Sequence, residues 1–399
     1  MPAVTAEIDI KAPVKYVYRA FTNSTSLREW LCDVATVDPH PNGRMYLWWH
    51  GDFYSSGHYL ELEENRKIVF QWYSSNDPDS TEVTVTLAET DEVTRLTLDH
   101  AVPDDGSWIM RATEFLEYWE ESLQNLKSVL ETGMDLRIAN RPMLGILPGD
   151  FTEEQAKALG VPVHDGLRID GVVEGMGAEA AGLQKDDVII RMAGKPITRQ
   201  FNSLLDAISG KKGGDTVEVV FHRGNEKKTV AMKLSKRPMP EIPFDPAELA
   251  RKARESYKPA LKEVEACFAG ASDKQAMKRP DPAEWSALEI VAHLIHTERF
   301  NSSFLASLID GNELTADGFG SNVTPQMEAT VKANPSIKLM LDLLRRTVEE
   351  VLFFTELIPE DFTANKGSYY RYAFNLLQPN LHITAHIQQI KDVLASAGK

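Results

Sequence analysis

Short alternating runs of apolar and polar residues fill the first third of the chain, and a long helical pattern ends it. Residues 4–11 alternate as a half-buried strand does, and Ala12-Pro13 stops that run. Apolar residues at helical spacing predict one amphipathic helix over 108–132. This order indicates an α+β domain over residues 1–135, in which an antiparallel sheet wraps around a helix in the helix-grip arrangement. The elements expected in between are short helices at 14–20 and 27–31 and strands at 44–50, 57–62, 68–73, 82–88 and 94–100.

The middle of the chain, residues 141–237, has the pattern of a small β-rich domain. Thr152 and Gln155 occupy the positions of a capping box, and Gly160 ends the short helix that they begin. Gly224-Asn225 predicts the turn of a hairpin. The other expected elements are strands at 167–173, 215–222 and 227–234 and a second helix at 201–209.

A proline-rich stretch at 236–246 predicts a domain boundary. Four prolines in this stretch suit a stiff extended linker and not a packed element. Residues 244–399 beyond it have helical periodicity and no strand signals, so an all-α four-helix bundle is predicted. The four helices are expected at 246–269, 285–309, 335–357 and 370–396.

Composition and charge narrow the classes of function. The 399 residues are 43% apolar and carry a net charge of −16, and residues 1–140 hold 11 basic and 24 acidic groups. An acidic chain without a basic stripe is not expected to bind nucleic acid. No run approaches the roughly 18–20 apolar residues of a membrane helix, and the N-terminus lacks the pattern of a secretory leader, so a cytoplasmic location away from membranes is expected. Cys32 and Cys267 are too few for a disulfide framework or a cysteine-based zinc site.

Four stretches of the first third carry a resemblance to a known superfamily. They are residues 8–13, Trp30, residues 38–43 and residues 48–57. They resemble the SRPBCC/START-like superfamily, in the branch of the heat-shock-protein-90 ATPase activator homologues. The resemblance implies binding of an apolar small molecule or a protein partner and no shared catalytic set. A ligand cavity between the sheet and the last helix would be lined by Trp30, Trp48, Trp49, Phe70 and Trp72, which alternatively fill the core.

The run Gly-Ala-Glu-Ala-Ala-Gly-Leu-Gln-Lys-Asp-Asp-Val-Ile-Ile at 177–190 resembles the PDZ domains of bacterial proteases of the high-temperature-requirement class. The resemblance implies that a peptide adds as a strand and that a loop receives its C-terminal carboxylate. The alternative is a domain that only spaces its neighbours or binds internally. No Gly-Asn-Ser-Gly-Gly phrase accompanies it, so no protease triad is expected. By this resemblance Leu144, Gly145 and Ile146 cradle the carboxylate, Leu204, Leu205 and Ile208 shape the side-chain pocket, and Arg141 adds charge support.

Histidines of the last third carry candidate metal chemistry. His382 and His386 lie four residues apart, which places both imidazoles on one helix face. With the run Trp-Ser-Ala-Leu-Glu-Ile-Val-Ala-His at 285–293, this arrangement resembles the DinB-like four-helix metalloprotein family. The resemblance implies that His293, His382 and His386 bind a divalent transition metal: zinc, nickel, iron or copper. Pro379 is expected to kink the last helix, His296 is a competing ligand, and Glu298 is either an acid–base group or an exposed carboxylate.

Two functions from different classes follow. The first is a binding or adaptor protein that joins an apolar ligand or partner pocket, a module for protein C-terminal peptides and a three-histidine metal site. The second is a metal-dependent enzyme of the thiol transferase or hydrolase type, for which no catalytic residue is assigned. An enzyme needs a metal site that opens into a pocket, which would separate the two. The oligomeric state stays open, with a homodimer among the alternatives.

Overall fold

The computed structural model describes residues 3–50, 53–75, 77–103, 108–149, 151–199, 201–282, 284–313 and 323–397. These divide into two compact units. The first contains Met1–Asp135 together with Pro240–Lys399, and the second contains Leu136–Met239. The domain at the N-terminus and the helical domain at the C-terminus therefore belong to one unit, although the whole middle domain separates them in sequence.

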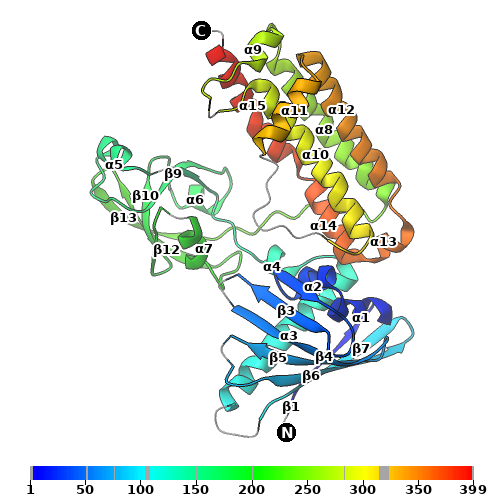
Figure 1. The fold of residues 1–399 in the computed structure, drawn as a ribbon. Coiled ribbons are helices and arrows are strands. Elements are labelled where there is room, and N and C mark those ends of the chain that lie inside the picture. The colour runs from blue at the N-terminus through cyan, green and yellow to red at the C-terminus, as the bar shows by residue number, and fades with distance from the viewer. Residues whose placement is uncertain are drawn as a thin grey trace. The chain divides into compact units, whose positions relative to one another are not determined.

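The N-terminal domain is a seven-stranded antiparallel sheet with the order β1-β7-β6-β5-β4-β3-β2 (Figure 1). The long helix α3 packs on it, and its buried Phe115, Trp119 and Leu123 join the sheet in one apolar core. The helix-grip prediction is confirmed. The sheet also contains a short strand that was not predicted, β2, which forms one of its two edges. The elements are β1 Ala3–Ile10, α1 Val14–Thr22, α2 Ser24–Trp30, β2 Val34–Val37, β3 Arg44–Trp49, β4 Phe53–Glu63, β5 Lys67–Ser74, β6 Thr81–Thr90, β7 Val93–Ala101 and α3 Ile109–Thr132.

The second unit is β-rich, as predicted. Its main strands follow the order β13-β12-β10-β9-β8, so β8 ends the sheet, and β11 pairs with β10. The capping box of Thr152 and Gln155 begins α5 and Gly160 ends it. The elements are α4 Leu136–Ala139, β8 Ile146–Gly149, α5 Glu153–Leu159, β9 Leu167–Val172, α6 Gly177–Ala180, β10 Val188–Met192, β11 Lys195–Pro196, α7 Phe201–Ala207, β12 Thr216–Arg223 and β13 Glu226–Lys233.

The C-terminal domain is a helical bundle, as predicted, with four long helices that lie side by side (Figure 1). In the part of the chain that the structure describes, four shorter helices, α9, α11, α13 and α14, lie between them in sequence. The long helices are α8 Pro246–Cys267, α10 Ala287–Ile309, α12 Ile337–Glu356 and α15 Pro379–Ala397; the shorter ones are α9 Asp273–Met277, α11 Thr324–Ala333, α13 Glu360–Ala364 and α14 Lys366–Leu376.

The expected helix over 370–396 is two helices. α14 ends at Leu376 and α15 begins at Pro379. Proline lacks the N–H that a helix interior needs, but at the first position of a helix no partner is required for it. Pro379 therefore begins a new helix and does not kink one.

The proline-rich linker is extended, but it is not unpacked throughout. Ile242 is buried, and the Phe244 ring stacks on Tyr369 of α14 with 5.5 Å between ring centroids. The Tyr369 hydroxyl donates a hydrogen bond to the carbonyl of Pro243, at 2.8 Å. The prediction of a stretch without packing is wrong for 242–244, because apolar residues among the prolines can cover the bundle surface.

Candidate functional site

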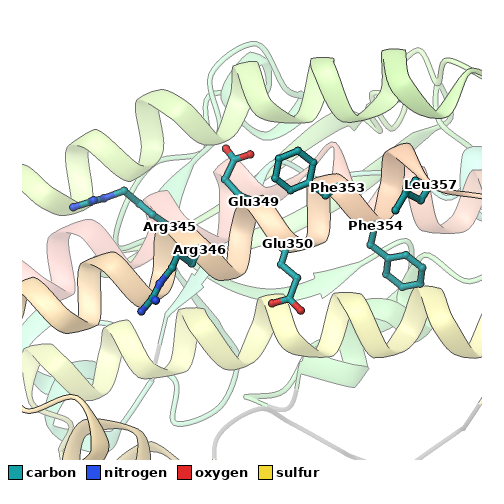
Figure 2. A pocket seen from close by; sticks show the side chains of 7 residues that line it. All are labelled: Arg345, Arg346, Glu349, Glu350, Phe353, Phe354 and Leu357. Atoms are coloured by element: carbon teal, nitrogen blue, oxygen red, sulfur yellow. The ribbon is translucent and has the colours of Figure 1, made fainter.

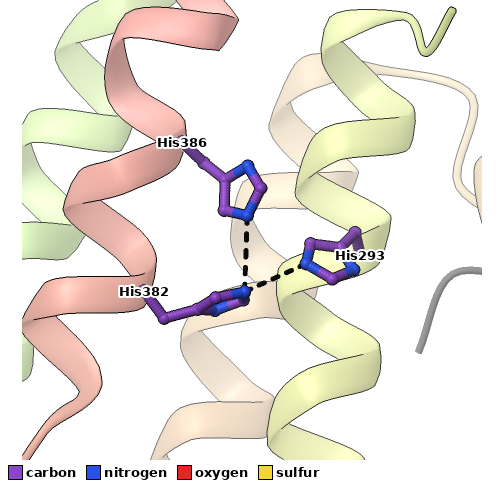
Figure 3. Close-up of side chains that lie close together, drawn as sticks. All are labelled: His293, His382 and His386. Carbon is purple, nitrogen blue, oxygen red and sulfur yellow. Dashed lines mark hydrogen bonds between the residues drawn. The ribbon is translucent and has the colours of Figure 1, made fainter. Parts of the chain in front are cut away.

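Three histidine side chains of the bundle converge on one point (Figure 3). His293 extends from α10, and His382 and His386 extend from α15. The Nε2 atom of His382 lies 3.0 Å from Nε2 of His293 and 3.3 Å from Nε2 of His386. One ligand nitrogen from each ring lies within 4.8 Å of the other two. These separations are the size that ligands of one ion require, since Zn–N bonds of about 2.0–2.1 Å place two ligands roughly 3.3 Å apart in a tetrahedron.

The start of α10 determines where His293 lies. Ser286 and Glu289 form a capping box there, so the helix begins at Ala287 and His293 falls in its second turn. The Glu289 carboxylate also pairs with the guanidinium of Arg279. Burial alone raises the pKa of Glu289, but the hydrogen bonds from Arg279 and Ser286 outweigh it and lower the pKa below its usual value. Glu289 is therefore ionised in the first turn of α10.

Neighbouring side chains orient two of the rings. His386 Nδ1 lies 2.7 Å from Oε1 of Gln389, one turn further along α15. An amide oxygen can only accept, so Nδ1–H of His386 donates and its Nε2 keeps a lone pair toward the cluster. The Trp285 ring lies against His293, with 5.3 Å between centroids. Gln389 is not among the residues predicted for the site, although its i,i+3 spacing from His386 is a usable signal.

The surroundings of His382 favour its neutral imidazole. Burial lowers the pKa of His382, and the neighbouring His386 lowers it further. Neutral imidazole is the form that binds metal, and three imidazole nitrogens suit zinc, nickel, iron or copper. His293 is buried, whereas His382 and His386 are half-buried. The residues present therefore fit a divalent transition metal with one side open toward solvent.

Two residues near the cluster do not belong to it. His296 Nε2 lies 2.8 Å from the Thr330 hydroxyl of α11, so this ring faces a different helix and is not a competing ligand. Glu298 is 3% exposed, and it accepts hydrogen bonds from the Tyr257 hydroxyl at 2.8 Å and from Asn301 at 3.2 Å. Burial raises the pKa of Glu298. The prediction of an exposed carboxylate is wrong, because Glu298 faces α8 inside the bundle.

The predicted peptide-binding residues lie around β8 and α7. Gly145 has a φ of +73°, and a Cβ there would lie 2.3 Å from Cβ of Met176, so only glycine fits. Ile146 begins β8, the last strand of the sheet. The Leu205 side chain of α7 is 45% exposed, whereas Leu144, Leu204 and Ile208 lie in the core. Thus, of the three residues predicted to shape the side-chain pocket, Leu205 is the one that is open to a ligand.

The aromatic residues predicted for a ligand cavity have three different surroundings. Trp30, Phe70 and Trp72 are buried in the core of the N-terminal domain, and the indole N–H of Trp30 donates to the carbonyl of Ala20. Trp49 is half-buried and packs against the Trp72 ring. Trp48 alternates with it along β3 and contacts His50. A cavity of about 10 Å³ touches Trp30, which is room for one water at most.

A groove of about 590 Å³ follows the outer side of α12 (Figure 2). The Phe353 ring is 56% exposed and Leu357 is 76% exposed. Arg254 of α8 lies over Phe353 and pairs with Glu349. The histidine cluster borders neither this groove nor the small cavity beside Trp30. Among the described residues, the groove is lined by Arg345, Arg346, Glu349, Glu350, Phe353, Phe354 and Leu357.

The fold and these sites define a modular protein with a helix-grip domain, a PDZ domain and a helical bundle with a three-histidine cluster. Family models match all three parts in that order. Residues 11–131 match the activator of Hsp90 ATPase homolog 1-like protein family, residues 142–234 match the PDZ domain, and residues 256–389 match the DinB superfamily. The chain therefore carries one domain of each kind, as the sequence analysis predicted.

Individual relatives resemble parts of the chain. The serine protease Do-like HtrA of Bacillus subtilis (strain 168) is 28% identical over an alignment of 120 residues, and the match covers 28% of this chain and 27% of that protein. The Aha1 dimer from Colwellia psychrerythraea is 20% identical, with coverage of 33% of this chain and 97% of that chain and a TM-score of 0.28. An HSP90 activator from Plasmodium falciparum is 25% identical, with coverage of 32% and 96% and a TM-score of 0.27. Among the described helices, none has the length and apolar character that a membrane crossing requires.

Proposed function

We propose that this chain is a modular binding protein whose bundle holds one divalent transition metal through His293, His382 and His386. The observation that carries the proposal is the convergence of three Nε2 atoms from two helices. Hydrogen bonds can satisfy only one of the two close nitrogen pairs, because Nε2 of His382 carries either one proton or one lone pair, and Nε2 of His386 keeps its own lone pair. A metal ion would remove that conflict and join α10 to α15.

Metal binding is tested on the full chain. The protein is stripped with a chelator, dialysed and titrated with zinc and, separately, with nickel. One equivalent should bind and should raise the melting temperature, since a ligand of the folded state stabilises it by mass action. Elemental analysis of untreated protein gives the stoichiometry. A melting temperature that neither ion changes would refute the proposed site.

The peptide-binding part of the proposal concerns the second unit. A peptide with a free C-terminus would add as a strand along β8, with its carboxylate at Leu144, Gly145 and Ile146 and its last side chain beside Leu205. The exposed Leu205 and the glycine at position 145 support this assignment. Screening a library of apolar C-terminal peptides, each with an amidated twin, tests it. Equal binding of the two forms would exclude the carboxylate site.

The N-terminal domain is proposed to contact an apolar small molecule or a protein partner. Its aromatic residues support an apolar contact surface, but three of the five predicted for a cavity already pack in the core. Binding of a protein partner at the surface therefore fits this packed interior better than binding of a small molecule inside it. Native mass spectrometry of protein from its own host tests both, because a retained small molecule and a co-purified partner differ in mass. A domain that carries neither would contradict this part.

The enzyme alternative rests on one observation, the exposure of the cluster on one side. His382 and His386 are half-buried, and three protein ligands leave coordination positions free, as in catalytic zinc sites. In that case the metal would act as a Lewis acid or lower the pKa of a bound water. Turnover of thiol-acceptor or ester substrates by metal-loaded protein, lost on chelation and in His382→Ala, would favour it. Absence of turnover together with retained peptide binding favours the binding protein.

A further inference from the structure

A buried cluster of charged side chains joins the N-terminal domain to the bundle within the first unit. Glu29 of α2 is 4% exposed. Its Oε1 accepts a short hydrogen bond from the Ser368 hydroxyl of α14, and it lies 3.8 Å from Nη1 of Arg371, also on α14. Glu29 is thus a carboxyl group of one domain that makes its polar contacts with α14 of the other domain.

Arg371 makes its closest ion pair with Glu313 and not with Glu29. Its guanidinium makes two hydrogen bonds of 2.9 Å to the carboxylate of Glu313, which follows α10. Arg28 of α2 pairs with the same carboxylate at 2.9 Å, and the backbone N–H of Glu313 donates to the Thr25 hydroxyl at 3.0 Å. Glu29 therefore receives a share of Arg371 at a longer distance and a smaller effect of Arg19, while Glu313 has two close partners.

The helices around Glu29 leave almost no free space. A Cβ on Gly367, in the first turn of α14, would lie 2.6 Å from Oε2 of Glu29 and 2.8 Å from Val129 of α3. Gly133, just after α3, has a φ of +80°, and a Cβ there would lie 2.6 Å from the carbonyl of Lys366. The cavity of about 10 Å³ beside Glu29 has room for one water at most. Hydration of the carboxylate is therefore minimal while α14 stays docked.

We propose that the carboxyl group of Glu29 is a pH-sensitive latch, which holds α14 of the bundle against α2 and α3 when protonated and weakens this docking when ionised. The groups that face it are Ser368 and Arg371 from α14, Arg19 from α1 and Glu313 from the segment after α10. The small cavity beside it is also lined by Tyr16 of α1 and by the apolar α3 residues Leu126, Val129 and Leu130. Ionisation places a carboxylate where water is almost excluded, and the shared Arg371 together with Arg19 compensates for that only in part.

The direction of the pH effect follows from the pKa of Glu29. Burial raises this pKa to about 7, against the opposing effects of Arg371, Ser368 and Arg19. A solvated glutamate titrates near about 4.3. Between these two values the docked state holds a proton that the undocked state has lost, so docking is strongest at low pH and weakens as pH rises through 7. Above 7 both states are ionised, and the docking equilibrium no longer depends on this group.

Hydrogen–deuterium exchange of the full chain tests the latch. After correction for intrinsic rates, protection of the first turn of α14 should fall with pH, by at most about tenfold per unit below 7, and level off above it. Glu29→Gln should stay docked without this pH dependence, because the amide has the shape of the protonated acid and no charge. Glu117→Gln, on an exposed position of α3, is the matched control and should keep the wild-type profile. Identical pH profiles in wild type and Glu29→Gln would overturn the proposal.

A second variant keeps the test informative if Glu29→Gln fails to fold. Gly367→Ala should separate α14 from Glu29 at every pH, because its Cβ overlaps the carboxylate and Val129. Protection in wild type should then approach that of Gly367→Ala as pH rises from 5.5 to 8. A difference between wild type and Gly367→Ala that stays constant over this range would also overturn the proposal.

Discussion

The Nε2 atoms of His293 and His382 lie 3.0 Å apart, although 89 positions separate the two residues in the chain. α10 and α15 pack directly against each other in the bundle, so this approach is set by helix packing. His386 lies on the next turn of α15, and its Nε2 is 3.3 Å from Nε2 of His382. The consequences of this arrangement for metal binding can be measured.

Replacing His382 with Ala should abolish most of the rise in melting temperature that zinc produces. His382 is the central ring of the three, since its Nε2 is the one near both others. Two remaining histidines would leave a site with weaker and less specific affinity. Thermal melts with and without zinc measure this. His58→Ala is the control, because His58 is exposed on β4 and outside the cluster, and it should keep the full rise. A full rise in His382→Ala would remove this residue from the site.

Replacing Gln389 with Ala should weaken zinc affinity by about 10–100-fold, the usual effect of losing a group that orients a metal-binding histidine. Its Oε1 accepts from Nδ1 of His386 at 2.7 Å and so turns Nε2 toward the cluster. Competition with a chromophoric chelator gives the affinities. Gln388→Ala changes the adjacent exposed residue, which bonds to Asp392 at 2.8 Å, and should bind zinc like wild type. Equal affinities of both variants would leave Gln389 without an orienting role.

Replacing Tyr257 with Phe should destabilise the first unit by about 1–3 kcal/mol, the usual cost of leaving a buried polar group with a missing partner. The Tyr257 hydroxyl donates to the Glu298 carboxylate inside the bundle, and both residues are at most 3% exposed. Urea unfolding measures the free energy. Tyr46→Phe, at a position that is 42% exposed, is the control and should change it little. A neutral result for Tyr257→Phe would mean that water or another donor replaces the hydroxyl.

Replacing Gly145 with Ala should destabilise the second unit more than replacing Gly210 with Ala. Both glycines have a φ of +73°, so both changes carry the left-handed penalty of about 1–2 kcal/mol. Only at Gly145 would the new Cβ also meet Met176, at 2.3 Å; no atom lies within 4 Å at Gly210. The difference between the two variants isolates the steric clash. Equal losses of stability would mean that Met176 moves away at no cost, and peptide binding by Gly145→Ala then shows whether the loop keeps its shape.

Most helices and strands, and the local spacing of the candidate site residues, can be predicted from residue order alone. Alternation gave most strands of the helix-grip sheet, and the capping box of Ser286 and Glu289 gave the start of α10. The i,i+4 spacing placed His382 and His386 on one helix face. These features depend on neighbours within about one turn or one hairpin, so the order of residues along the chain already contains them.

Which faces meet depends on how distant parts of the chain pack. It turned His296 toward Thr330 and buried Glu298 against Tyr257, and neither outcome can be predicted from helical periodicity. It also brought Glu29 to Ser368 across 339 positions and combined the first and last domains into one unit. The physical reason is that periodicity specifies a direction around one helix axis, whereas the partner in that direction depends on how distant elements pack to fill a shared core.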